Sequence, residues 1–78
     1  MSIKEEYPDL LTLDGFDEAI LGVVERIDLL VVCYDKNKII RILTRDMSEM
    51  QALEYYEFNI LGAYMGESTP VYLDMMEL

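Results

Sequence analysis

Histidine and tryptophan are absent from this 78-residue chain, and cysteine occurs once, as Cys33. Without histidine the commonest general base is missing, and neither a Ser-His-Asp triad nor a Cys-His pair can be built. One cysteine forms no disulfide within the chain, and alone it cannot supply the usual ligand set of a structural zinc site. The glycines form no phosphate-binding loop before a lysine. The sequence therefore predicts no enzyme, no metal site and no cofactor.

Basic residues are also scarce, because six lysines and arginines accompany sixteen acids and give a formal net charge of −10. A surface of this charge repels nucleic acid and anionic membranes and attracts basic proteins. We therefore expect no direct contact with nucleic acid or membrane, and a protein partner that is basic or itself binds nucleic acid. A simpler interpretation is that the acids keep a small hydrophobic protein soluble.

The few basic residues are concentrated in one ten-residue segment, which holds Lys36, Lys38, Arg41 and Arg45. Lys38, Arg41 and Arg45 recur at spacings of three and four, so they share one side of a helix. This basic strip is expected either to pair with the protein's own acids or to contact a partner.

Long apolar runs are missing as well. The longest, residues 29–34, is far too short to span a membrane, and no segment resembles a targeting signal. A lone cysteine and no export signal favour the reducing cytoplasm. Cys33 lies inside this run and is predicted to be a small buried hydrophobe. A reactive thiol near Lys36 and Lys38 is the alternative.

The small size of the chain limits its core. A domain of this length buries only roughly 60% of the surface that its unfolded chain exposes. Disulfides and structural zinc are excluded as supports, and 53% of the residues are hydrophobic. Self-association into a homodimer is therefore an available source of stability.

The first third of the chain predicts an arm followed by a hairpin. Residues 1–15 are interrupted by Pro8 and end in a turn dipeptide, Asp14-Gly15. Residues 10–13 fit either a short strand or one helical turn. Residues 19–26 favour a strand, because the segment is rich in β-branched valine and contains a glycine, although a helix fits the apolar spacing too. Residues 29–34 predict a buried strand that completes the hairpin.

Two helices and a strand are expected to follow. Asp35 is a good N-cap for a helix through Arg45. Ser48 and Gln51 form a capping-box pattern that begins a second helix, which ends at a glycine, Gly62 or Gly66. Its buried face is predicted from Leu53, Tyr56 and Ile60, and residues 69–73 form the last strand.

These elements predict an α+β fold, a small three-stranded antiparallel sheet packed against two helices in the order β-β-α-α-β. Residues 1–15 would be an N-terminal arm, residues 16–73 a single domain, and residues 74–78 an acidic tail.

The candidate contact residues lie on and after the second helix. Glu57 borders the predicted apolar face, so it is either a perturbed acid in a pocket with Glu67, or an acceptor for a backbone amide or Arg41. Asn59 and the glycine-containing loop 62–70 could contact a ligand. Tyr55 points away from the predicted buried face and is an exposed aromatic suited to protein contact.

Several motifs resemble small uncharacterised proteins of bacteriophages and prophages. The resemblance covers about residues 14–73 and rests on Asp14-Gly15-Phe16-Asp17-Glu18-Ala19-Ile20, Glu54-Tyr55-Tyr56-Glu57-Phe58-Asn59, Gly62-Ala63-Tyr64, Gly66-Glu67 and Thr69-Pro70-Val71. It implies a setting, the cytoplasm of a bacterial host, and no assigned reaction.

Together these observations favour a small acidic accessory protein that binds a host or phage protein, in one version as a mimic of nucleic acid. One alternative is a ligand-binding or catalytic module around Glu57, Asn59 and residues 62–70. Another is a structural homodimer with no ligand.

Overall fold

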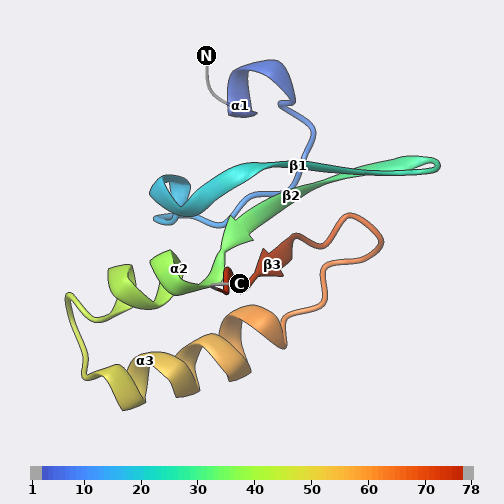
Figure 1. Ribbon diagram of the computed structural model, residues 1–78. Helices are drawn as coiled ribbons and strands as arrows, with labels where there is room; N and C mark the ends of the chain where they lie inside the picture. The colour runs from blue at the N-terminus through green and yellow to red at the C-terminus, as the bar shows by residue number, and fades with distance from the viewer. Residues whose placement is uncertain (1–2, 77–78) are drawn as a thin grey trace.

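A computed structural model describes residues 3–76, and its centre is a β-hairpin (Figure 1). A 3-10 turn, η1 (Asp17–Ala19), leads into β1 (Ile20–Arg26), which pairs antiparallel with β2 (Leu29–Asp35). The strand prediction for the ambiguous stretch is thus confirmed. The valine-rich segment lies in an edge strand, where β-branched side chains pack well. The register shifts between Ile20 and Gly22, so β1 carries a bulge at its start.

Asp35 ends β2 and starts α2 (Lys36–Leu43). Its carboxylate Oδ1 accepts hydrogen bonds from the backbone amides of Asn37 at 3.0 Å and Lys38 at 3.3 Å. Asp35 is the predicted N-cap, and it is buried. The helix ends two residues earlier than predicted, since the Thr44 hydroxyl donates to the carbonyl of Arg41 at 2.7 Å and the chain turns there.

The predicted capping box begins α3 (Glu49–Tyr55), with Ser48 Oγ accepting from the Gln51 amide at 3.2 Å and Gln51 Oε1 accepting from the Ser48 amide at 3.0 Å. The helix then widens into a π-helical segment, η2 (Tyr56–Leu61). The amide of Gly62 donates to the carbonyl of Glu57, five residues back, at 3.1 Å. No sequence signal predicted this widening.

The buried face of α3 and η2 differs from the prediction at one position. Tyr56 and Ile60 are buried as expected, but Leu53 is 39% exposed and Ala52 is fully buried in its place. Residues 52, 56 and 60 are spaced by four and face the core together, where the small alanine side chain permits close packing. The larger leucine beside it is rotated towards solvent.

The last strand, β3 (Val71–Leu73), pairs parallel with β2, so the expectation of an all-antiparallel sheet is wrong for this pair. After η2 the loop 62–70 carries the chain towards the tip of the hairpin before β3 begins, as Figure 1 shows. The chain therefore re-enters the sheet in the same direction as β2. Parallel strands need a crossover connection of this kind, which α2, α3 and η2 provide here. Gly66, with φ of +91°, makes the turn in this loop.

Within the N-terminal arm, residues 3–15 pack against the rest of the molecule. The arm's single helical turn is α1 (Ile3–Glu6), and residues 10–13 have no regular secondary structure. Ile3, Leu10 and Leu13 pack against the core, and the amide of Leu13 donates to the hydroxyl of Tyr34 at 2.7 Å. In Figure 1 α1 lies on the opposite side of the hairpin from α2 and α3.

The core joins the sheet to both helices and includes a cluster of three tyrosines. The rings of Tyr34 and Tyr72, register partners on β2 and β3, stack with centroids 5.9 Å apart. Tyr56 of η2 meets Tyr72 edge-on at 5.6 Å. The buried residues around them are Ala19, Val32, Ile39, Leu43, Ala52 and Ile60. This tyrosine cluster holds the C-terminal strand against the helical layer.

Candidate functional site

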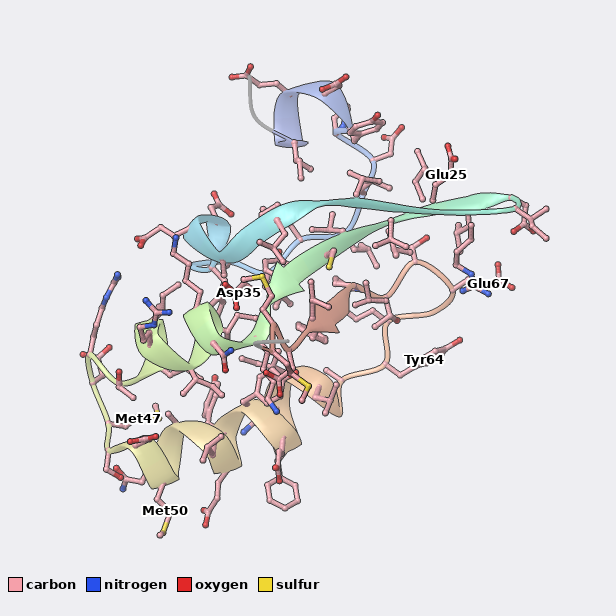
Figure 2. The ribbon with its side chains drawn as sticks, in the orientation of Figure 1. Glu25, Asp35, Met47, Met50, Tyr64 and Glu67 are labelled. Atoms are coloured by element: carbon pink, nitrogen blue, oxygen red, sulfur yellow. The ribbon has the colours of Figure 1, made fainter. Side chains whose placement is uncertain are left out.

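The structure separates the predicted contact residues. Tyr55 and Asn59 line one hollow beside α3, whereas Glu67 lines another between the loop 62–70 and the tip of the hairpin. Glu57 lines neither of these two hollows and is exposed. Figure 2 shows Glu67 at the hairpin end of the molecule, far along the fold from Met50 at the start of α3. The four side chains therefore do not form one pocket.

Neither interpretation of Glu57 describes its surroundings. Within residues 3–76 its carboxylate has no hydrogen bond to a backbone amide and no ion pair with Arg41 or another base. It is an exposed acid on η2, and its charge raises the pKa of the neighbouring Tyr56, an effect smaller than those of burial and of Asp74. Its contribution to a site is therefore negative charge at the surface.

Only part of the basic strip forms ion pairs with acids of the same molecule. Arg45 pairs with Glu18 of η1 at 3.1 Å, between two exposed side chains. Lys38 and Arg41 are exposed on α2 and have no ion-pair partner within the described residues. Lys36, on another side of the helix, lies 3.7 Å from Asp74 and 5.5 Å from the centre of the Tyr56 ring. These contacts tie α2 to the end of β3 and to η2.

A surface with several exposed apolar side chains lies on the outside of α3 and η2. We call it the outer face and define it by its exposed apolar side chains, Met50, Leu53, Tyr55, Phe58 and Leu61. Phe58 is 78% exposed and Met50 74% exposed. Met50 and Phe58 lie on the side of the helix opposite Ala52 and Tyr56, with Leu53 and Tyr55 at its two margins. Exposed apolar side chains grouped on one side of a helix are typical of contact surfaces. Three exposed acids, Glu49, Glu54 and Glu57, lie among them.

An open hollow of about 460 Å³ adjoins the outer face, and we call it the α3 groove. One wall comes from the connection between α2 and α3, and the other from α3 and η2. Its lining residues are Asp46, Met47, Gln51, Glu54, Tyr55, Phe58 and Asn59. The groove thus combines two carboxylates and two aromatic rings, and no basic residue lines it.

A larger hollow, of about 790 Å³, lies between the N-terminal arm and the hairpin. Its charged residues are Asp9, Glu25, Arg26 and Asp28, so an arginine already sits among its acids. The α3 groove has no such internal counter-charge. The two linings therefore carry the same net charge, −2, and differ in that the carboxylates of the α3 groove have no basic residue beside them in the lining.

Burial raises the pKa of three groups, Tyr72, Tyr56 and Cys33, and so favours their neutral forms. Burial, with smaller contributions from Tyr56 and Tyr34, raises the pKa of Tyr72 to about 12. Burial also raises the pKa of the Cys33 thiol, which lies half-buried in the middle of β2. A raised pKa disfavours the nucleophilic thiolate at neutral pH, which argues against the alternative of a reactive thiol. Cys33 is only half-buried, so the prediction of a buried hydrophobe is not met in full.

Among residues 3–76, no three carboxylate or thiol side chains gather in an arrangement that could hold a metal ion. The helices in this part of the chain are all too short or too polar to cross a membrane.

The exposure of Met50, Phe58 and Leu61 was not anticipated. Met50, Glu54 and Phe58 are spaced by four, two residues out of step with Ala52, Tyr56 and Ile60, so they occupy the opposite side of the helix. That spacing was a readable signal once the buried set was known.

Comparison of the chain with models of protein families, with curated proteins and with solved structures finds no significant match in any of the three. The outer face and the α3 groove therefore have to be interpreted from their own chemistry.

Proposed function

We propose that this protein is a small acidic accessory protein that acts by binding another protein through the outer face of α3 and η2. The observation that carries the proposal is the exposure of Phe58 and Met50, 78% and 74%, on one helix surface. Burying such side chains against a partner stabilises a complex by about 25 cal/mol per Å² of apolar area removed from water. Aromatic anchors are the side chains that most often dominate binding energy.

Charge supports a basic partner. The chain carries −10 overall, and the segment from Asp46 to its end contains seven acids and no base. Electrostatic attraction of this kind accelerates association and selects partners of opposite charge. The resemblance to bacteriophage proteins adds a setting to the proposal, a host or phage protein in the bacterial cytoplasm as the partner.

The test is an affinity capture from bacterial lysate with wild-type protein and two single variants, followed by quantitative mass spectrometry. Phe58→Ala removes an exposed ring from the outer face, and Ile27→Ala removes a fully exposed apolar side chain from the hairpin tip. We expect a stoichiometric partner whose capture falls at least about tenfold with Phe58→Ala, which corresponds to roughly 1.4 kcal/mol, and is unchanged with Ile27→Ala.

Equal loss with both variants, or with neither, contradicts the outer face as the binding surface. Circular dichroism of each variant checks that folding is intact, because both side chains are exposed and their removal should change stability by less than about 0.5 kcal/mol. Sedimentation of the purified protein at several concentrations distinguishes a foreign partner from a homodimer through the same surface.

A further inference from the structure

The α3 groove has a chemical character of its own, apart from the apolar outer face beside it. Asp46, from the connection after α2, and Glu54, from α3, both line it. Neither carboxylate has a hydrogen bond or an ion pair within the described residues. Both are exposed to solvent. Two uncompensated negative charges thus border one concave site.

The remaining lining adds aromatic surface and polar groups. Tyr55 and Phe58 line the groove from the same side as Glu54, and they are 43% and 78% exposed. The side-chain amide of Asn59 has no hydrogen-bond partner within residues 3–76, whereas the side chain of Gln51 is engaged in the capping box. A ligand in the groove therefore meets carboxylates, ring surface and one free amide together.

A guanidinium group matches this combination better than other biological cations. It is planar, it is permanently charged, its five N–H donors suit carboxylate oxygens, and it stacks on aromatic rings. A lysine ammonium could satisfy the charge but would use the ring surface less well, because it is a compact and strongly hydrated point charge.

We infer that the α3 groove receives an arginine side chain from a basic, partly apolar segment of the partner protein. The inference rests on the proposed function, because the apolar part of the same segment would cover the outer face next to the groove. A second copy of this chain is a poor source of the arginine, since each copy carries a net charge of −10 and the two would repel.

The probe is a synthetic helical peptide that carries arginines on one face and leucines on the other. The matched probe replaces each arginine by citrulline, which keeps the shape and removes the charge. Affinities are measured by calorimetry at one fixed ionic strength with four proteins: the wild type, Glu54→Gln, Phe58→Ala and Glu25→Gln. Glu25 is an exposed acid on β1, on the far side of the molecule from Met50 in Figure 2, and its variant changes the net charge by the same amount.

We expect the citrulline peptide to bind the wild type at least about tenfold more weakly, because the charge-assisted hydrogen bonds are lost. Glu54→Gln should weaken the arginine peptide about fivefold, whereas Glu25→Gln should change its affinity less than about twofold, since a distant surface charge is screened. In a heteronuclear NMR titration with the arginine peptide, amide shifts should centre on residues 46–59.

Three results overturn the inference. If Glu54→Gln and Glu25→Gln weaken binding equally, the attraction is a matter of net charge and the groove is not selective. If Phe58→Ala abolishes binding while Glu54→Gln and citrulline have no effect, the proposed function stands and the arginine site fails. If neither Glu54→Gln nor Phe58→Ala changes binding of the peptide, the outer face and the groove both fail.

Discussion

Removing the hydroxyl of Tyr34 and removing that of Tyr72, two members of the same cluster, should change the stability of the protein in opposite directions. Tyr34 and Tyr72 stack on each other, so replacing either by phenylalanine removes one oxygen and keeps the ring. The hydroxyl of Tyr34, a completely buried residue, accepts the Leu13 amide at 2.7 Å. The hydroxyl of Tyr72 is buried and has no hydrogen-bond partner within the described residues.

The magnitudes follow from the cost of an unsatisfied polar group, which is about 1–3 kcal/mol. Tyr34→Phe leaves the partly buried amide of Leu13 without its acceptor and should lower the free energy of unfolding by about that amount. Tyr72→Phe removes a hydroxyl that was desolvated without compensation, so it should raise the free energy of unfolding by about 1 kcal/mol. The two variants should therefore differ by at least about 2 kcal/mol.

Urea denaturation followed by far-UV circular dichroism measures both changes, with the m-value as the check that the same surface is exposed on unfolding. For a domain of this size, 1 kcal/mol corresponds to roughly 4–8 °C in Tm. Equal destabilisation by the two variants would refute the reasoning. It would mean that the packing of neighbouring atoms against each hydroxyl, and not its hydrogen bonding, determines the change in the free energy of unfolding.

The remaining predictions concern pH and the start of α2. Because burial raises the pKa of Tyr72 to about 12, the unfolded chain loses this proton first, from about pH 10 upward. The unfolded state then binds fewer protons than the folded state, so stability is complete below about pH 10 and falls as pH rises towards 12. Urea midpoints measured from pH 8 to 11.5 should show this fall in the wild type and a smaller one in Tyr72→Phe. Asp35→Ala removes the acceptor of two amides at the start of α2 and should cost about 1 kcal/mol, up to about 2. The matched change Asp74→Ala, at an exposed acid with longer contacts to Lys36 and Asn37, should cost less than about 0.5 kcal/mol in the same urea titration; equal losses would show that the cap contributes nothing of its own.

The elements whose signals are local could be predicted from the sequence. Asp35 and the pair Ser48 and Gln51 cap their helices as expected, because a capping side chain bonds amides only two or three residues away. The order β-β-α-α-β and the exposure of Tyr55 follow from residue spacing alone.

The features that were missed depend on contacts between distant residues. The direction of β3 is set by the loop 62–70, and a three-residue strand carries no signal for parallel or antiparallel pairing. The π-helical segment after Tyr55 depends on packing of Tyr56 and Ile60 against the sheet. The α3 groove has a different origin, because the residues that line it all lie between positions 46 and 59. Its shape depends on how the connection after α2 folds against α3, and residue spacing carries no signal for that.

The tyrosine cluster also gives the molecule a built-in optical probe. The chain has no tryptophan, so its near-ultraviolet signals come from six tyrosines and two phenylalanines, and three of these tyrosines meet where β3 joins β2. Pairing of Cys33 with Val71 closes a far longer stretch of chain than the turn of the hairpin does, and closure of longer loops costs more entropy. Tyrosine fluorescence and near-ultraviolet dichroism should therefore report the docking of the last strand separately from formation of the hairpin, without any label.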